Sequence, residues 1–164
     1  MISLAAIPYI IRPPRNNEEW ETVKKLLLDY RQEFNNDECF TSFEEELADI
    51  ENLYAKRGNV KLIAVSEPGG EIAGCIASQE LAPGVTEMKR LYVVPAHRSH
   101  KLGRKLVESI MAVAVENGYE KIQLDTMPEM KAAQQLYDRL GFHVIPPYKD
   151  QGQERMICYE KTLK

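Results

Sequence analysis

Apolar side chains in the first third of the chain recur at the spacing of a helix. Between residues 20 and 34 they fall three or four positions apart, with charged residues between them, at Trp20, Val23, Leu27, Tyr30 and Phe34. This spacing predicts one amphipathic helix, preceded by a short strand at 9–12. Ser42 followed by Glu45 fits a capping box, and the apolar residues after it predict a second helix that ends near Gly58.

From residue 60 onwards, short apolar runs replace the helical spacing. The runs at 60–66 and 72–77 flank Pro68-Gly69-Gly70, which predicts a hairpin. The later pattern predicts strands at 85–94, 121–126, 142–145 and 155–162, a loop after residue 94, a long helix from Leu102 to Gly118, and a helix at 129–140. A hairpin combined with strand-helix-strand units predicts an α/β fold of mixed α+β character: a twisted mixed sheet of about seven strands with helices on both faces. A single domain over residues 1–164 is expected from the length.

Composition narrows the class of protein. The 164 residues are 44% hydrophobic and 28% charged, which is typical of a folded globular domain and not of a disordered chain. Three cysteines, Cys39, Cys75 and Cys158, form no C-x-x-C pair, so we expect small buried side chains rather than a disulfide framework, a zinc ribbon or a nucleophile. There is neither an export signal nor an apolar run of the roughly 20 residues that a membrane span needs, so a cytoplasmic location and no membrane partner are expected.

Charge is distributed unevenly along the chain. Residues 1–84 carry 8 Lys and Arg against 15 Asp and Glu, whereas residues 85–164 carry 13 against 10. Between Met88 and Val107 there is no acid, and the basic residues are Lys89, Arg90, Arg98, Lys101, Arg104 and Lys105. A basic loop that leads into a helix N-terminus favours phosphate binding, because unpaired N–H groups and the helix dipole add to the side-chain charge. A solvated basic surface is the alternative, and the glycine motifs of P-loops and dinucleotide-binding folds are absent.

Three segments resemble the GNAT superfamily of N-acetyltransferases. They are residues 87–95 (EMKRLYVVP), 98–103 (RSHKLG) and 133–142 (AQQLYDRLGF), and the segment 124–133 is similar to a bacterial branch of that family. The resemblance implies the GNAT fold, with acetyl-CoA as the acetyl donor. It also implies transfer to a primary amine by direct attack, with no metal and no covalent enzyme intermediate.

The same resemblance implies where the cofactor binds. It places the pyrophosphate on the loop and helix start formed by Arg98, Ser99, His100, Lys101, Leu102, Gly103 and Arg104. It also implies that the main chain of Leu91, Tyr92 and Val93 pairs with the pantetheine arm as another strand would.

Two positions depart from the family pattern. Lys101 stands where the family loop has a glycine, and glycine lets a backbone adopt positive φ and approach phosphate closely. Lys101 must therefore keep ordinary dihedral angles or accept strain, and its ammonium could contact phosphate directly instead. Met130 stands where many members have an asparagine near the cofactor.

The resemblance assigns chemistry to two side chains. Tyr137 matches the family's general acid for the departing CoA thiolate, and a phenol with a pKa of about 10 stays protonated at neutral pH. Glu87 matches a glutamate that acts as a base through water. A base is useful because an amine with a pKa of about 10.4 is almost fully protonated at neutral pH. The alternatives are a tyrosine that only packs on the sheet and an exposed glutamate at the start of a strand.

The acidic segment between Glu33 and Glu51 bears on the acceptor. Eight acids and no Lys or Arg lie between Glu33 and Glu51, and they include Asp37 and Glu38. The first two helices of the GNAT fold border the acceptor cleft, so the resemblance predicts a small-molecule or peptide amine attracted by its positive charge. A helix N-terminus and a solvated helix face explain the acids at 44–46 equally well.

Two other classes of function stay open. One is an inactive acyl-CoA-binding sensor or interaction module, which Lys101 favours, and the other is an RNA-binding module. The presence of both Glu87 and Tyr137 favours the enzyme, and the net charge of −4 disfavours RNA. No nucleic-acid partner is therefore expected, and a homodimer is compatible with the family.

Overall fold

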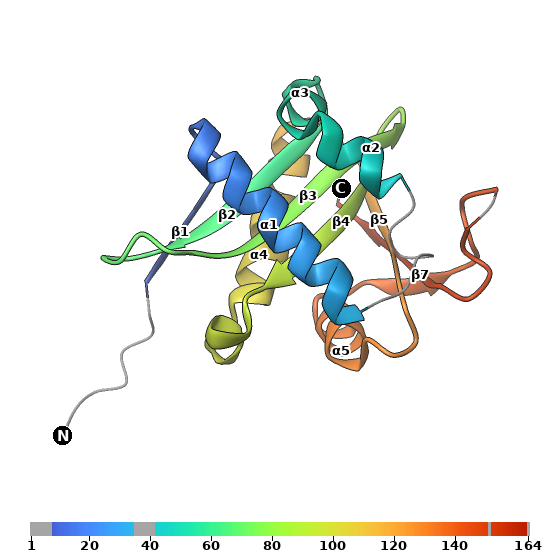
Figure 1. Cartoon of the computed structure of the whole chain (residues 1–164). Coiled ribbons are helices and arrows are strands. Elements are labelled where there is room, and N and C mark those ends of the chain that lie inside the picture. Colours follow the sequence, from blue (N-terminus) through green and yellow to red (C-terminus); the bar gives the residue numbers. More distant parts are fainter. Residues whose placement is uncertain (1–7, 35–41, 151, 164) are drawn as a thin grey trace.

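The computed structural model describes residues 8–34, 42–150 and 152–163, which build a seven-stranded sheet with helices on both faces (Figure 1). In chain order the elements are β1 (Tyr9–Arg12), α1 (Asn17–Phe34), α2 (Phe43–Ala48), α3 (Ile50–Ala55), β2 (Val60–Ser66), β3 (Ile72–Ala82), β4 (Val85–Val93), the 3-10 helix η2 (Pro95–His100), α4 (Leu102–Glu116), β5 (Lys121–Thr126), α5 (Lys131–Arg139), β6 (His143–Ile145) and β7 (Ile157–Thr162). The predicted fold class is confirmed.

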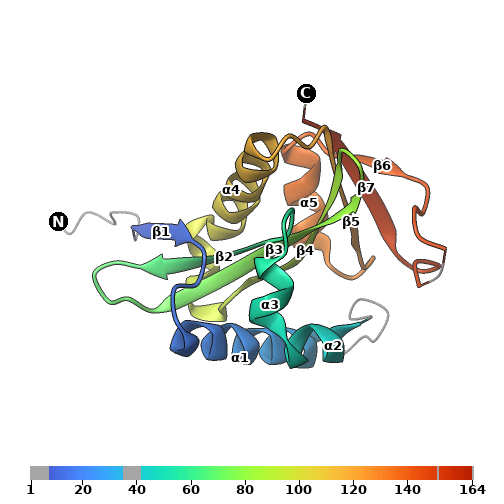
Figure 2. The same cartoon turned by 90° about the horizontal axis from the view of Figure 1, so that it is seen from above.

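The sheet is mixed, with the strand order β1-β2-β3-β4-β5-β7-β6. Neighbouring strands are antiparallel except for β4 and β5, which are parallel because α4 carries the chain back across the sheet between them. Figure 2 shows α1, α2 and α3 along one face and α4 and α5 along the other. The site described below lies where the parallel pair meets these two layers.

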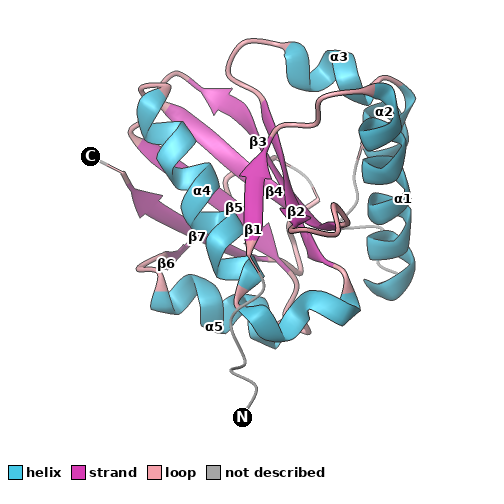
Figure 3. Cartoon of the chain, turned by 90° about the vertical axis from the view of Figure 1, so that its left-hand side faces the viewer, coloured by secondary structure: helices cyan, strands magenta, loops and turns pink. Residues whose placement is uncertain are grey.

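Two hydrophobic cores hold the layers together. The first lies between the sheet and α1–α3 and includes the fully buried Val23 and Leu27 of α1. The second lies under α4 and α5, where Leu102, Leu106 and Ile110 follow the four-residue spacing that places them on one face of α4. Figure 3, seen from the β1 edge, shows α4 and α1 on opposite sides of the sheet. Each large apolar side chain buried in this way contributes roughly 1.5–3 kcal/mol.

β4 contains a bulge at its centre. Its register against β3 shifts between Cys75 and Ala77, so that Arg90 and Leu91 together lie opposite one residue of β3. Arg90 has a φ of 59°, in the left-handed region. The extra residue interrupts the alternation of side chains. Lys89 and Arg90 therefore both lie on the face covered by α1–α3, whereas Leu91 packs against the other core.

β4 and β5 are paired over only part of their length. Their ladder joins residues 85–87 to residues 121–123, although β4 continues to Val93 and β5 to Thr126. Beyond this ladder the two strands line opposite sides of an opening in the sheet. A cavity can form here because β5 does not pair with the second half of β4.

The structure corrects three local predictions. The expected capping box is absent, because Ser42 has a φ of 60° and its side chain makes no capping hydrogen bond. The helix expected after it is split into α2 and α3 at Asp49, whose φ is −148°. The loop expected after β4 contains η2. A side-chain cap forms at the start of α1 instead, where the Glu19 amide donates to Asn16 Oδ1 over 2.9 Å.

Some expectations fall on parts of the chain outside the described residues. Asp37, Glu38 and Cys39 lie there. Of the other cysteines, Cys75 and Cys158 are buried, as predicted, and burial raises the pKa of both thiols, that of Cys158 to about 11. No helix within the described ranges has the length and apolar character to cross a membrane.

Candidate active site

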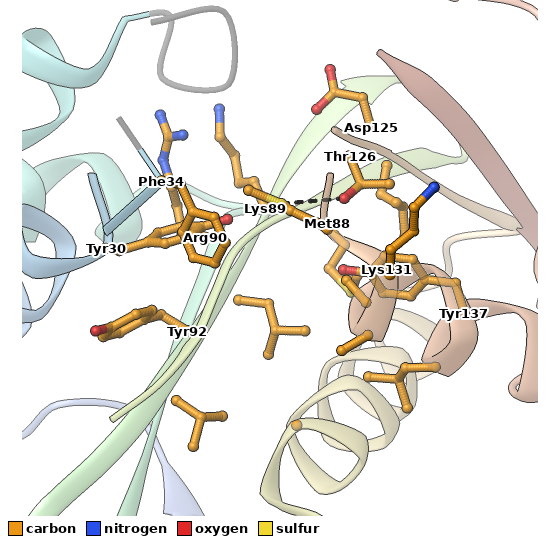
Figure 4. Close-up of a pocket in the computed structure, with 18 of the residues that line it drawn as sticks. Tyr30, Phe34, Met88, Lys89, Arg90, Tyr92, Asp125, Thr126, Lys131 and Tyr137 are labelled. Atoms are coloured by element: carbon orange, nitrogen blue, oxygen red, sulfur yellow. Dashed lines mark hydrogen bonds between the residues drawn. The ribbon is translucent and has the colours of Figure 1, made fainter. Parts of the chain in front are cut away.

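A cavity of about 510 Å³ occupies the opening between β4 and β5. Residues 87–93 of β4 and 124–126 of β5 form two of its walls, and residues 129–133 with Leu136 and Tyr137 close the side of α5. Figure 4 shows Tyr30, Arg90 and Tyr92 along one side and Thr126, Lys131 and Tyr137 along the other. The cavity therefore exposes the edge of β4 to a ligand that enters between the strands.

Tyr137 lies on α5 and is 5% exposed. Its ring packs at 5.7 Å from the rings of Phe142 and of Tyr159, so the packing role is real. The same residue lines the cavity. Packing and catalysis are compatible here, because the ring is fixed by its aromatic neighbours while the residue borders the space that a ligand would fill.

Glu87 is buried in the wall formed by β4, with 4% of its surface exposed. The alternative of an exposed glutamate at a strand start is therefore wrong. The Tyr148 hydroxyl donates to Glu87 Oε2 over 2.6 Å, and the Lys149 ammonium lies 2.7 Å from the same oxygen. The other oxygen, Oε1, lies 4.0 Å from the Lys89 ammonium. Burial and the charge of Glu87 raise the pKa of Tyr148, so this phenol stays protonated and donates.

The loop between β6 and β7 is held over Glu87 by Gln153. This glutamine is 2% exposed, and its Oε1 accepts hydrogen bonds of 3.0 Å from the amides of Tyr148 and Lys149. Its Nε2 donates to Asp125 Oδ2 over 2.8 Å. Because the side-chain amide of Gln153 satisfies main-chain and carboxylate groups at once, it holds Tyr148 and Lys149 in position beside the cavity.

Arg90 joins the bulge to the helical layer above it. Its Nε donates to Glu46 Oε1 over 3.0 Å, and the Tyr54 hydroxyl donates to Glu46 Oε2 over 3.0 Å. Burial by itself raises the pKa of Glu46, but the charges of Arg90 and of two lysines outweigh this effect and lower it. A second cavity of about 270 Å³ lies beside this pair, and Lys89 lines both cavities.

Arg98 borders the other end of the main cavity. Its Nη2 lies 2.8 Å from both carboxylate oxygens of Glu33, at the end of α1. Its Nε donates to the Val93 carbonyl over 3.0 Å, and its guanidinium lies 5.5 Å from the ring centre of Tyr92. Arg98 is thus positioned at the end of β4 by three separate contacts.

Comparison with known proteins assigns this arrangement to a family. Residues 20–142 match the model of the Acetyltransferase (GNAT) family. The chain belongs to the GNAT family. It is an N-acetyltransferase that uses acetyl-CoA, which confirms the predicted activity and acetyl donor.

Individual acetyltransferases are similar to this chain in sequence or in fold. An uncharacterised N-acetyltransferase of Schizosaccharomyces pombe is 36% identical over 132 residues, which cover 80% of each chain. A Streptococcus agalactiae acetyltransferase structure superposes with a TM-score of 0.80 at 22% identity, covering 94% of this chain and 98% of that one. A Salmonella typhimurium acetyltransferase solved with acetyl-CoA gives a TM-score of 0.68 at 19% identity, covering 96% and 95%.

The residues predicted for the GNAT cofactor divide into two groups. Leu91, Tyr92, Val93, Arg98 and Gly103 line the cavity. The others do not: the Leu102 side chain is fully buried in the core, Arg104 lies 3.4 Å from Glu108, and His100 is half-buried, with its ring 6.4 Å from that of Tyr9. Ser99 lies in η2, and its side chain is outside the described part.

Lys101 accepts the conformation that the GNAT glycine would have. Its φ is 57° and its ψ is 26°, and it is the residue before the first turn of α4. The backbone path of the loop is therefore kept without the glycine, at a cost of roughly 1–2 kcal/mol for a left-handed non-glycine residue. α4 has no acidic residue in its first turn, so its N-terminus stays positive.

The basic segment at 88–107 is divided between two parts of the fold, with Lys89 and Arg90 inside the predicted strand at 85–94. Lys89 and Arg90 lie at the bulge and not at the start of α4. His97 does not face the cavity, because Tyr9 and Glu71 occupy its two ring nitrogens at 2.7 and 3.3 Å. The positive charge near the start of α4 comes from Arg98, Lys101 and the basic residues of the first turn.

Sequence reasoning missed the group that surrounds Glu87. Tyr148 and Lys149 lie 61 and 62 positions away, and Gln153 and Asp125 act through hydrogen bonds that no local pattern encodes. The one signal was the Pro146-Pro147 pair, which marks a loop but not what the loop covers. Among the described residues, no group of three or more His, Cys, Asp or Glu is arranged to hold a metal ion.

Proposed function

We propose that this GNAT protein transfers the acetyl group of acetyl-CoA to a primary amine by direct attack of the amine in the cavity between β4 and β5. One observation carries the proposal. A single cavity exposes the edge of β4 at residues 91–93 and is lined by Tyr137 at one side and by Arg98 and Gly103 at its end. An extended pantetheine arm needs a strand edge, and its thiol needs a proton donor.

Several residues would hold acetyl-CoA. The main chain of Leu91, Tyr92 and Val93 would pair with the pantetheine arm along the edge of β4 that faces β5, where β5 no longer pairs with it. Arg98 and the N–H groups at the start of α4, next to Lys101, would hold the pyrophosphate. When bound, acetyl-CoA supplies an activated thioester carbonyl. An amide of the bulged strand would polarise that carbonyl.

Tyr137 would donate the proton that the departing thiolate takes up. An unperturbed phenol has a pKa of about 10, so it is protonated at neutral pH and ready to donate. Its ring is fixed by Phe142 and Tyr159, so the hydroxyl would be held in one position relative to the CoA sulfur.

Glu87 would accept the proton of the acceptor amine through a water molecule. Its Oε2 already accepts from Tyr148 and Lys149, so Oε1 is the oxygen available for this role. Lys149 and Tyr148 would keep the carboxylate in one orientation. The acceptor would enter from the face of α1–α3, on which Glu87, Lys89 and Arg90 lie.

A positively charged acceptor is less well supported than the acidic segment suggested. Three of its acids already have arginine partners: Glu33 pairs with Arg98, Glu44 with Arg31, and Glu46 with Arg90. The attraction left for a cation comes from the exposed acids near the second cavity, Glu45 and Asp49. A single domain over 1–164, a cytoplasmic location and a homodimer stay predictions of the sequence.

Calorimetric titration of acetyl-CoA into the protein tests the proposal, with release of free thiol in the presence of amines as the second measurement. Arg98→Ala should weaken binding about tenfold, because one charge-assisted contact to phosphate is lost. Arg31→Ala is the matched control, since it removes a similar exposed arginine–glutamate pair that does not line the cavity. No saturable binding to the wild type, or no thiol release with any amine, would contradict the proposal.

A further inference from the structure

Lys89 lies at the junction of the two cavities, on the face from which the acceptor enters. The bulge places it there, because Arg90 interrupts the alternation of β4 and both side chains lie on the same face. In Figure 4 the side chains of Lys89 and Arg90 extend from β4 toward the same side of the cavity. Lys89 thus brings a positive charge to a part of the cavity that is not among the residues proposed to bind acetyl-CoA.

Three other cations that line the main cavity have close acidic partners. Arg90 pairs with Glu46 at 3.0 Å, Lys149 with Glu87 at 2.7 Å, and Arg98 with Glu33 at 2.8 Å. Within the described part of the chain, the nearest acidic oxygen to the Lys89 ammonium is Glu87 Oε1, at 4.0 Å. Lys131, the remaining lysine of the lining, is exposed at the start of α5.

The Lys89 side chain is 20% exposed, so its charge is only partly solvated. Burial and the neighbouring charge of Arg90 lower the pKa of Lys89, against the opposing effect of Glu87. An ammonium in this position gains more from an added anion than one in water does, because it has lost hydration without gaining a close partner.

We propose that the acceptor is an α-amino acid, with the Lys89 ammonium binding its carboxylate while its amine lies beside Glu87. This inference rests on the proposed function and names the substrate class of the same site. The match is one of charge and spacing. Lys89 and Glu87 present a cation and an anion 4.0 Å apart, and the amine nitrogen and carboxylate oxygens of an α-amino acid are about 3 Å apart by standard bond lengths.

The charges of Lys89 and Glu87 are therefore complementary to the carboxylate and the amine of an α-amino acid. The carboxylate of the acceptor lies against Lys89, and its amine lies on the side of Glu87 Oε1, the oxygen that Tyr148 and Lys149 leave available, with the proton-carrying water between them. In this orientation the amine faces the main cavity and the acceptor's side chain faces the second cavity. A diamine or a simple alkylamine has an amine for Glu87 but no carboxylate for Lys89.

The test compares L-amino acids with their α-carboxamides as acceptors, measured as kcat/KM for thiol release at saturating acetyl-CoA. The amide keeps the amine and the side chain but loses the negative charge, and its amine is intrinsically easier to deprotonate. The wild type should favour the free acid at least tenfold, mainly through KM. Lys89→Met should reduce this preference to about one by slowing the acids while leaving the amides almost unchanged.

Lys131→Met is the matched control, because it removes another lysine of the lining from the opposite wall. It should leave the ratio of acid to amide as in the wild type. Titration of acetyl-CoA into Lys89→Met shows whether the variant is folded and binds the donor. A wild type that acetylates amides or diamines as well as amino acids, or a Lys89→Met variant that keeps the preference, overturns the inference alone. Failure to acetylate any amine overturns the proposed function as well.

Discussion

Both carboxylate oxygens of Glu33 lie 2.8 Å from Nη2 of Arg98, so the end of α1 is tied to the segment that follows β4. This arginine is the one expected to bind the cofactor pyrophosphate. Phosphate and Glu33 therefore compete for the same guanidinium, and the ion pair sets the charge that a phosphate meets on arrival.

Glu33→Gln should tighten acetyl-CoA binding by about three- to tenfold, because Arg98 no longer gives up an ion pair to bind phosphate. The dissociation constant from calorimetry measures the effect. Glu44→Gln, which breaks the similar pair with Arg31 away from the cavity, is the control and should change little. Weaker binding in Glu33→Gln would mean that the glutamate holds Arg98 in place for the cofactor.

Tyr137→Phe should lower kcat by about 10²-fold or more while the acetyl-CoA dissociation constant changes little. The substitution removes the proton donor and keeps the ring that packs against Phe142 and Tyr159. Steady-state kinetics and calorimetry on the same preparation separate the two effects. An unchanged kcat would remove Tyr137 from the chemistry and leave it a packing role.

Glu87→Gln tests the base. If Glu87 takes the proton of the amine, the variant should be slow at neutral pH and recover as the pH approaches the pKa of the amine, near 10, where free base is abundant. Tyr148→Phe removes one hydrogen bond to Glu87 but keeps the carboxylate, so its pH profile should retain the wild-type shape. A uniform loss at every pH in Glu87→Gln would instead indicate a positioning role.

Glu19 should make stability sensitive to acid. Hydrogen bonds from Arg12 lower the pKa of Glu19 to about 2, from an ordinary value of 4.5. The unfolded chain therefore takes up this proton first as the pH falls. The stabilisation is complete above about pH 4.5 and is lost as the pH falls through about 2.

Glu19→Gln should accordingly cost about 1–2 kcal/mol of unfolding free energy at pH 7, and the difference from the wild type should shrink as the pH drops from 4.5 toward 2. Urea unfolding at a series of pH values measures it. Glu21→Gln, in an exposed pair with Lys24, should change stability only slightly at any pH. A pH-independent cost would contradict the assignment to Glu19.

Lys61 is a buried cation, and we expect its charge to make no net contribution to the stability of the fold. Its side chain is fully enclosed, its Nζ has no hydrogen-bond partner among the described residues, and it lies 5.4 Å from the ring centre of Tyr54. Lys61→Met keeps the stem and removes a buried charge that no hydrogen bond satisfies, so it should raise the free energy of unfolding by about 1 kcal/mol although the attraction to Glu46 is lost. Lys61→Ala, which also leaves a void, should not. Destabilisation in Lys61→Met would show that the contact with Tyr54 outweighs the cost of burial.

The sequence was most informative where local periodicity decides structure. The stripe from Trp20 to Phe34 and the run at 121–126 became α1 and β5, because burial of one face or of a whole strand leaves a direct trace in the order of residues. The motif at 133–142 also contains Tyr137, which lines the cavity. In each case the information lies within a window of about one element.

The rest depends on contacts that a window does not contain. Lys89 and Arg90 fall within the predicted strand at 85–94, but only the bulge shows that both side chains lie on the face covered by α1–α3. Ser42 has the residue type of a helix cap, yet Asn16 is the residue whose side chain forms one. The partners of Glu87 come from a loop more than 60 positions away, where nothing in composition marks them.

The bulge at Arg90 also limits how the protein can change. One inserted residue interrupts the ladder of β4 beside the place where a donor would pair with the strand, and the same residue puts two cations on the face from which the proposed acceptor would enter. Removal of that residue would reverse the faces of every side chain beyond it. Donor binding and acceptor choice are therefore coupled through the backbone, and a new acceptor preference would have to arise by exchange of side chains on a strand whose register is kept.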